Sequence, residues 1–342
     1  MMRYKLLGRS GLRVSELALG TMTFGEDWGW GASREESGRI FEAYAEAGGN
    51  FIDTACNYTG GTSERYVGEF IKADRDHFVL ATKYTLSDRQ GDLNFGGNHR
   101  KNLMRSLKGS LERLQTDHVD LLWLHAWDFT TPPQEVMRAL DDAVRSGQVH
   151  HVGISDSPAW VVAQANTLAD LRGWSPFVAL QVPYSLASRD AERDLLPMAR
   201  ALGLAVTPWA VLGGGVLSGK YNQPAAGPAR QQRENIAPER LKLAEAVMEV
   251  AREIGRSPAQ VALNWVRQQQ HRAQIVPILG ARTQAQLLDN LGALEFTLED
   301  AHLERLREAN PFKAGFPHEW FGQDHVQQLI FGDLRGSLER RT

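Results

Sequence analysis

The sequence is poor in cysteine. Its 342 residues include one cysteine, Cys56. A disulfide needs two cysteines and a thiolate metal cluster needs several, so neither can form within one chain. This composition suits a reducing compartment, and we expect a cytoplasmic protein.

Long apolar runs and an excess of one charge are also missing. No run of about 18 apolar residues occurs, and segment 1–20 lacks the continuous apolar stretch of a secretory signal. We therefore expect no membrane partner. The 38 basic and 41 acidic residues leave a formal net charge of -3. This balance gives no reason to expect nucleic acid as a partner.

The chain does have the composition of a folded globular protein. Hydrophobic residues make up 42% and charged residues 23% of the chain, which is enough to bury a large core. We expect one domain that spans residues 1–342.

Short segments rich in β-branched residues and leucine alternate with segments of helical spacing. Eight of them are predicted strands: 16–22, 51–55, 78–83, 119–126, 149–155, 177–185, 203–211 and 274–281. Between them, Ser33 with Glu36, Ser257 with Gln260 and Thr283 with Gln286 have the spacing of helix N-caps. The leucines of segment 98–115 fall on one helical face.

Eight apolar strands, each followed by a helix, predict an α/β fold of the parallel (β/α)₈ TIM-barrel type. The alternative is a doubly wound open sheet, but the loop after the first strand, "GTMTFGEDWGWG", lacks the GxGxxG pattern of that fold. The lead-in around Gly8–Gly11 predicts a β-hairpin that closes the bottom of the barrel. Extra C-terminal helices and a tail beyond residue 310 would then lie over one end.

Titratable residues stand at or near the ends of three adjacent predicted strands. Asp53, Lys83 and His125 lie at or near the ends of the second, third and fourth strands. Tyr58 falls in the loop after the second strand. Barrel enzymes carry their chemistry at this end of the strands. A nearby lysine favours the phenolate of a tyrosine, and an aspartate keeps that lysine charged. Such a group suits protonation of an oxygen while hydride adds to a carbonyl, which requires a nicotinamide cofactor.

These four residues, in "FIDTACNY", "LATK" and "LLWLHAWD", resemble the catalytic tetrad of the aldo-keto reductases. The segments "LGRSGLRVSELALGTMTFG", "GTSERYVGEFI", "VHHVGISD", "LQVPYS", "GGGVLSGKY" and "GARTQAQLLDNLGAL" extend the resemblance over nearly the whole chain. It is nearest to the bacterial, potassium-channel-β-like and aryl-alcohol-dehydrogenase-like branch. The resemblance implies NADPH-dependent, reversible reduction of an aldehyde or ketone, with Tyr58 as the general acid, Lys83 and Asp53 tuning it and His125 orienting the carbonyl.

The resemblance also implies a set of cofactor contacts. Ser155, Asp156 and Gln181 would hold the nicotinamide carboxamide and Trp209 would stack on the ring, with Thr21, Met22 and Asp53 on the other side. Leu212 and Gly214 would follow the pyrophosphate, and Lys220, Arg230, Gly280, Arg282, Gln286, Asp289 and Asn290 would hold the adenosine end. Three cations there favour NADPH over NADH, and a phosphate near Arg282 would gain from the N-terminus of the following helix. Asp156 departs from many family members, which have asparagine, and a carboxylate cannot donate to the carboxamide oxygen.

Three other patterns have competing interpretations. The stretch Gly214–Tyr221 nearly matches a P-loop, but tyrosine replaces the Mg²⁺-binding hydroxyl, so a dinucleotide loop fits better. Adjacent His150 and His151 point to opposite faces of a strand, which argues against a metal site. Aromatic residues in predicted loops and the tail either pack at the surface or form an aryl-accepting pocket; they are Trp28, Trp30, Trp127, Phe129, Phe316 and Trp320.

The substrate is thus expected to be a small carbonyl compound, with an aromatic one as an option. Two alternatives remain open at this level: a cofactor-sensing regulatory subunit, and an enzyme that acts mainly as an alcohol or sugar dehydrogenase. No metal is expected at the active site, and the sequence does not define the oligomeric state.

Overall fold

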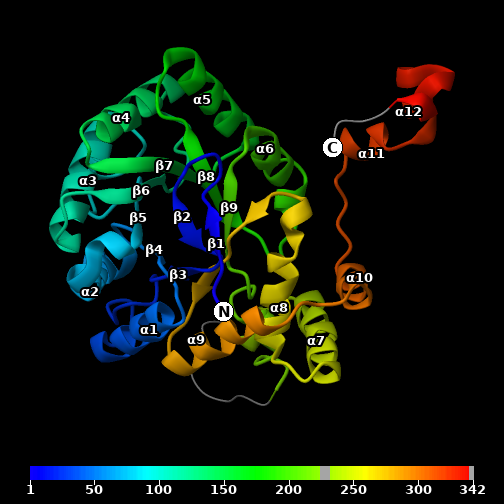
Figure 1. Cartoon of the computed structure of the whole chain (residues 1–342), viewed down its shortest axis with the longest axis horizontal. Helices are drawn as coiled ribbons and strands as arrows, with labels where there is room; N and C mark the ends of the chain where they lie inside the picture. The colour runs from blue at the N-terminus through cyan, green and yellow to red at the C-terminus, as the bar shows by residue number, and fades with distance from the viewer. Residues whose placement is uncertain (224–231, 339–342) are drawn as a thin grey trace.

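The computed structural model describes residues 1–223 and 232–338. A ring of parallel strands forms its centre, and helices surround the ring (Figure 1). The strands are β3 (Ala18–Gly20), β4 (Phe51–Asp53), β5 (Val79–Tyr84), β6 (Val119–Leu124), β7 (Val149–Ser155), β8 (Phe177–Pro183), β9 (Ala205–Trp209), β10 (Gln274–Ile275) and β11 (Ile278–Gly280).

The strand interrupted at Pro277 closes the ring. Its first part, β10, pairs with β9, and its second part, β11, pairs with β3, the first strand of the sheet. Val276 donates its N–H to Val206, and Pro277 accepts from the N–H of Ala18. Because proline has no N–H, the ladder to β9 ends at this point and the strand changes partner. β10 and β11 are therefore one barrel strand, and the predicted (β/α)₈ barrel is confirmed.

Helices follow the strands in the order that the sequence predicts. They are α1 (Arg34–Glu46), α2 (Thr62–Ile71), α3 (Arg100–Leu114), α4 (Pro133–Arg145), α5 (Ala159–Arg172), α6 (Leu195–Leu202), α7 (Pro238–Glu253), α8 (Pro258–Arg267), α9 (Gln284–Leu291), α10 (Asp300–Ala309), α11 (His318–Phe321) and α12 (Asp324–Phe331). The helix α7 precedes α8 as an additional element between β9 and β10. No helix in residues 1–223 and 232–338 is long and apolar enough to cross a membrane.

The predicted N-caps are present. Ser33, Ser257 and Thr283 each accept a hydrogen bond from the backbone N–H three residues later. Only Ser257 completes the reciprocal capping box, because the Glu36 carboxylate instead binds the N–H of Gln284. That contact ties the start of α9 to α1, which are far apart in the sequence.

The N-terminal hairpin, β1 (Tyr4–Leu6) with β2 (Arg13–Ser15), lies across the ring of strands at their N-terminal end (Figure 1). Leu7 and Val14 enter the apolar cluster inside the barrel. Gly8, with a φ of 58°, packs so tightly that an added Cβ would lie 2.1 Å from the carbonyl oxygen of Val178. The hairpin therefore closes the bottom of the barrel as predicted, and the opposite end stays open.

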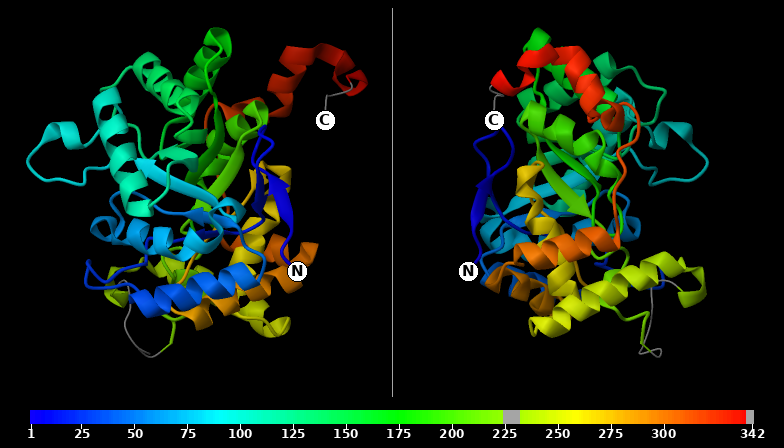
Figure 2. Two further views of the ribbon diagram at one scale, coloured as in Figure 1. Left: turned by 60° about the vertical axis from the view of Figure 1, so that its left-hand side comes forward. Right: turned by 90° about the vertical axis from the view of Figure 1, so that its right-hand side faces the viewer.

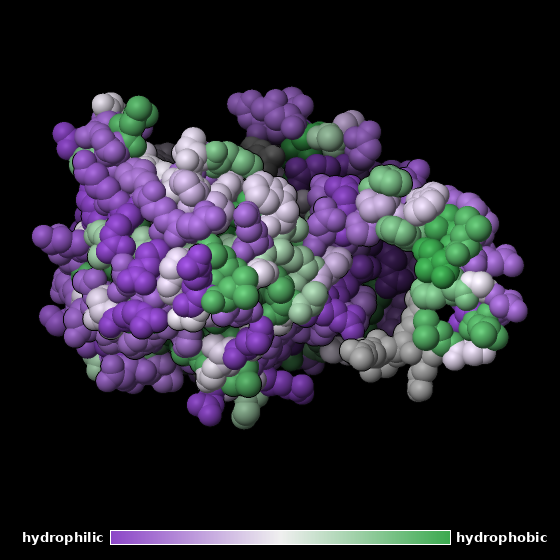
Figure 3. Space-filling view, turned by 90° about the horizontal axis from the view of Figure 1, so that it is seen from above, coloured by the Kyte–Doolittle hydropathy of each residue, from purple (hydrophilic) through white to green (hydrophobic). Residues whose placement is uncertain are grey.

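The C-terminal tail does not lie over an end of the barrel. Arg189 and Arg193 hold the carbonyls of Asn310 and Ala314, so the tail leaves beside α6. His318 of α11 contacts Asp194, the N-cap of α6, whereas α12 stands apart from the barrel (Figures 1 and 2). Its exposed apolar side chains gather at one extremity of the molecule (Figure 3); they include Trp320, Phe321, Leu329, Ile330 and Phe331.

Candidate active site

The inward-facing side chains of the barrel form layers, and the titratable residues occupy the layer nearest the open end. Side chains two residues apart on a strand share a face. Asp53 follows the interior residue Phe51 by two positions, and His125 follows interior Trp123 in the same way. Lys83 lies two positions after interior Ala81. The same strands that build the core therefore direct these groups into the open end.

A fully buried ion pair is at the centre of this layer. Lys83 Nζ lies 2.6 Å from Asp53 Oδ2 and also donates to the Thr54 carbonyl at 2.8 Å. Gln181 Nε2 donates to the other oxygen of Asp53 at 3.0 Å. Although burial disfavours the ammonium, the charges of Asp53 and Tyr58 outweigh it and raise the pKa of Lys83. The lysine is therefore charged at neutral pH and held in one position.

Tyr58 places its ring against this lysine. It begins the short helix η1 (Tyr58–Gly61), and Lys83 Nζ lies 4.8 Å from its ring centroid. Burial raises the pKa of the Tyr58 hydroxyl, Lys83 opposes that shift, and Asp53 adds to it, so that the net pKa is raised. The sequence correctly predicts the sign of the lysine's effect but not the net result, because it cannot show how deeply the phenol is buried. Tyr58 is thus a protonated phenol at neutral pH.

His125 faces Tyr58 with their ring centroids 6.0 Å apart. Burial and the charge of Lys83 lower the pKa of His125 to about 3. The imidazole is therefore neutral at neutral pH. Its Nδ1 is buried and has no hydrogen-bond partner among the described residues.

Buried hydroxyl groups fix the strand ends beneath the ion pair. Ser63, on α2, donates to the Thr21 carbonyl at 2.7 Å, and its oxygen lies 2.9 Å from the hydroxyl of Thr54. The Thr21 hydroxyl lies 2.8 Å from Ser63 and also donates to the Asp53 carbonyl. These bonds join β3, β4 and α2 below the site, so Thr54 presents its carbonyl to Lys83 from a rigid support.

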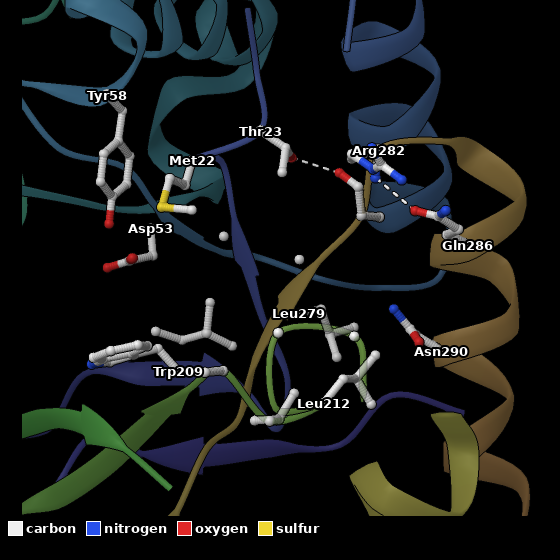
Figure 4. Close-up of a pocket in the computed structure, with 18 of the residues that line it drawn as sticks. Met22, Thr23, Asp53, Tyr58, Trp209, Leu212, Leu279, Arg282, Gln286 and Asn290 are labelled. Carbon is white, nitrogen blue, oxygen red and sulfur yellow. Dashed lines mark hydrogen bonds between the residues drawn. The ribbon is translucent and has the colours of Figure 1, made fainter. Parts of the chain in front are cut away.

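An elongated cavity of about 670 Å³ opens above these residues. Asp53, Tyr58 and Trp209 lie at one end of it, whereas Arg282, Gln286 and Asn290 lie at the other (Figure 4). The cavity thus extends from the titratable group to the start of α9.

Most of the predicted cofactor residues line this cavity. They are Met22, Asp53, Ser155, Asp156, Gln181, Trp209, Leu212, Gly214, Lys220, Gly280, Arg282, Gln286, Asp289 and Asn290. Thr21 is fully buried below it, and Lys83 lies behind Asp53 and Tyr58. Arg230 lies outside the described residues. The structure therefore brings together residues that are more than 250 positions apart in the sequence.

Two residues at the end of the cavity near Asp53 and Tyr58 are held in defined orientations. Trp209 donates its indole N–H to Asp156 Oδ1 at 3.2 Å. Asp156 itself adopts a left-handed backbone conformation with a φ of 39°, which asparagine and aspartate tolerate better than most residues. Burial raises the pKa of Asp156 despite the bond from Trp209. The buried hydroxyl oxygen of Ser155 has no partner among the described residues.

The backbone N–H groups at the start of α9 are not available to a phosphate in the way that the sequence predicts. The N–H of Arg282 donates to the Gln286 side chain, that of Gln284 to Glu36 and that of Gln286 to Thr283. These backbone groups therefore already have partners within the protein. An anion at this end would depend on the positive charge of Arg282 and on the helix dipole rather than on those N–H groups.

Sequence reasoning did not identify several residues of the cavity wall. Thr23 and Asn57 lie within predicted loops, and Ala259 and Leu263 belong to α8. Thr23 donates its hydroxyl to the Ala281 carbonyl, which joins the first and last βα loops (Figure 4). A search of all loops after predicted strands would have found Thr23 and Asn57, whereas α8 carries no local signal for its position.

The aromatic residues that the sequence singles out separate into two groups. Trp28 and Trp30 line the cavity, and Trp28 meets Tyr58 edge-on with a centroid separation of 6.4 Å. Trp127 is largely buried in the apolar core, and Phe129 is exposed. Phe316 and Trp320 lie in the tail and are absent from the cavity wall. Each alternative therefore holds for part of the set: the two tryptophans from the loop between β3 and α1 line the cavity, and the other four aromatic residues do not.

The fold and this site together define a (β/α)₈-barrel protein with a buried acid–base group at one end of a long cavity. Comparison with known proteins then gives the family: residues 16–311 match the Aldo/keto reductase family. The chain belongs to this family and is an oxidoreductase.

Individual relatives are similar over almost the whole chain. Norsolorinic acid reductase of Aspergillus flavus is 38% identical over 333 residues, which cover 94% of this chain and 84% of that protein. Aryl-alcohol dehydrogenase [NADP(+)] of Phanerodontia chrysosporium is 36% identical over 349 residues, covering 94% of this chain and 89% of that protein. An aryl-alcohol dehydrogenase of Pestalotiopsis microspora is 36% identical over 330 residues, covering 94% and 85%.

Proposed function

We propose that the protein reduces an aromatic aldehyde or ketone to the alcohol with NADPH, reversibly, and that residues 1–342 act as one catalytic unit. The observation that carries this proposal is the arrangement of Asp53, Lys83, Tyr58 and His125 at one end of the cavity.

Each of the four groups has a state that suits carbonyl reduction. The raised pKa of Tyr58 keeps a proton on the phenol, which donates it to the carbonyl oxygen as negative charge develops there. Lys83, held by Asp53, then stabilises the phenolate that remains. Neutral His125 presents an N–H donor that orients the same oxygen without competing as an acid. When bound, the nicotinamide supplies the hydride that no side chain can provide.

The cavity wall fits a nicotinamide dinucleotide. The buried hydroxyl of Ser155 has no hydrogen-bond partner in the described part of the chain, as expected for a residue whose partner is the carboxamide of the cofactor. Trp209, held by Asp156, provides a flat surface for the ring, and Gln181 lines the wall beside them. Glycines at 214 and 280 leave room for a close approach of the phosphates and ribose.

A cationic adenosine end favours NADPH. Lys220 and Arg282 line the cavity, and Arg282 lies at the end opposite Asp53 and Tyr58 (Figure 4). A 2′-phosphate gains a charge-assisted hydrogen bond from such groups. A curated relative is named as an aryl-alcohol dehydrogenase that uses NADP(+), which supports the same choice.

An aromatic substrate fits the end of the cavity near Tyr58. Trp28, Trp30 and Leu86 line the cavity near Tyr58 and make that part apolar. The name aryl-alcohol dehydrogenase points to an aromatic substrate for that relative, and another relative is named as a reductase of norsolorinic acid. Their similarity to this chain supports our proposal that it belongs to the aryl-alcohol-dehydrogenase-like branch of the family.

The test follows NADPH oxidation with aromatic and aliphatic aldehydes. We expect aromatic aldehydes to be turned over faster, and Tyr58→Phe to lose about 100-fold or more in kcat because a positioned general acid contributes that much. Binding of NADPH, measured by quenching of tryptophan fluorescence, should be unchanged in the variant. Tight binding without turnover of any carbonyl or alcohol would contradict the proposal and favour the cofactor-sensing alternative.

A further inference from the structure

A group of side chains at the bottom of the barrel has the composition of a metal site. His118 lies directly before β6, Asp120 is its second residue, and His150 is the second residue of β7. Each offers one ligand atom, and these atoms all lie within 4.8 Å of one another. In the sequence, His150 has a histidine neighbour, His151, but no further ligand at the spacing of a known metal motif. The pairing of β6 with β7 supplies the missing ligands from a segment about thirty residues earlier.

The carboxylate of this group is held in place before any ion arrives. Asp120 Oδ2 accepts hydrogen bonds from Arg75 Nη2 and from the N–H of Leu80, both at 2.9 Å. Its other oxygen, Oδ1, lies 3.4 Å from His150 Nδ1. One oxygen is therefore fixed by the protein, and the other faces the imidazoles.

The first imidazole is oriented by a second carboxylate. His118 Nδ1 lies 2.7 Å from Asp117 Oδ1. This contact favours the tautomer with hydrogen on Nδ1 and leaves Nε2 as the ligand atom, in the manner of carboxylate–histidine–metal groups. The His118 and His150 rings stack with a centroid separation of 4.5 Å and an interplanar angle of 27°, so the two imidazoles lie side by side.

The local charge also suits a cation. Asp117 and Asp120 carry two negative charges, and Arg75 balances one of them, so one negative charge remains beside two imidazoles. His118 and Asp120 are partly buried, and His150 is exposed, which leaves a route for an ion from solvent. Two imidazoles and one carboxylate are the ligands of borderline divalent cations, above all Zn²⁺, and three protein ligands leave a fourth position for water.

We propose that His118, Asp120 and His150 form a Zn²⁺ site that links the starts of β6 and β7. The site is separate from the chemistry, because His125 lies seven residues further along the chain from His118, a span of roughly 20 Å at the rise of an extended strand. Binding requires the two stacked rings to splay slightly about their side-chain torsions. Its consequence is stabilisation of the barrel by mass action, since the unfolded chain does not hold the three ligands together.

The test is calorimetric titration of the chelator-treated, untagged full-length protein with ZnCl₂ at pH 7.5. We expect saturable binding of one ion per chain, together with a rise in the melting temperature. His118→Ala and His150→Ala should each weaken binding at least tenfold, and Asp117→Asn should weaken it about tenfold through loss of the orienting bond. NADPH-dependent turnover should be unchanged in all three variants.

His318→Gln is the matched control. His318 Nε2 lies 3.1 Å from one carboxylate, Asp194 Oδ1, at the surface. No second imidazole completes a ligand group with it in the described part of the chain. This variant should bind Zn²⁺ like the original protein. If a variant of the site proves unstable without metal, Co²⁺ absorption of the original protein decides the coordination instead. No saturable binding, or equal binding in His118→Ala, His150→Ala and His318→Gln, would overturn the proposal.

Discussion

The buried pair of Lys83 and Asp53 gives the sharpest stability prediction. Lys83 is fully buried, and the Asp53 side chain is only 4% exposed. At a separation of 2.6 Å, two unit charges attract by roughly 6 kcal/mol if the effective dielectric constant is about 20. Removing one partner forfeits this attraction and leaves the other charge buried. Lys83→Met and Asp53→Asn should therefore each lower the free energy of unfolding by about 3 to 5 kcal/mol.

The double variant Lys83→Met/Asp53→Asn removes both charges and should cost less than the sum of the single changes. We expect a coupling energy of about 2 to 3 kcal/mol, as for groups in direct contact. The assay is equilibrium urea unfolding at pH 7 without cofactor, followed by tryptophan fluorescence, and the linear extrapolation gives the free energy of unfolding.

An exposed pair with nearly the same separation provides the control. Arg305 lies 2.7 Å from Glu253, but the two side chains are 38% and 50% exposed. Arg305→Met should leave the urea midpoint almost unchanged, because solvent screens such pairs. If Lys83→Met costs less than about 1 kcal/mol, or if the single costs add up in the double variant, the account of a mutually dependent buried pair is wrong.

Three further predictions concern pH, cofactor choice and packing. The pKa of His125 is about 3 in the folded protein and 6.5 in the unfolded chain, so the unfolded chain binds the extra proton between these values and stability falls as pH falls from 6.5 towards 3. This contributes a slope of about 1.4 kcal/mol per pH unit to the free energy of unfolding. Between pH 7.5 and pH 5, the free energy of unfolding measured with urea should therefore fall less for His125→Asn than for the original protein. An equal fall in both proteins would contradict the lowered pKa of His125. Arg282→Met should raise the KM for NADPH about tenfold or more but change the KM for NADH little, and parallel changes in steady-state kinetics would argue against a phosphate contact. Gly153→Ala should lower the free energy of unfolding by about 1 to 3 kcal/mol, since its Cβ would lie 2.4 Å from the Trp123 ring. Thermal unfolding should show no such loss for Gly11→Ala, where an added Cβ would meet no atom of another described residue within 4 Å apart from its chain neighbours.

The order and type of the elements could be predicted from the sequence because their signals are local. Apolar strands such as Phe51–Asp53, helix caps such as Ser257 and the turn at Gly8 depend on residues within a few positions of one another. The position of His125 at a strand end is equally local. Counting these signals gave the barrel, and the residue types at the strand ends gave the acid–base group.

The net protonation of that group could not be predicted in the same way. Burial comes from every element that packs around a side chain, so the raised pKa of Tyr58 and the strongly lowered pKa of His125 are properties of the assembled barrel. The role of Gln286 is a similar case, because its side chain binds the N–H of Arg282 instead of completing the cap of its own helix.

Thus the sequence by itself determined which elements form, in what order, and which residues stand at the open ends of the strands. The tertiary structure alone decided which residues from distant segments meet. It closed the barrel at Pro277, it brought Gln181 to Asp53, and it placed His118 and Asp120 beside His150. The physical reason is that backbone preferences act over a few residues, whereas distances and burial between separate strands are set only when the ring of strands closes.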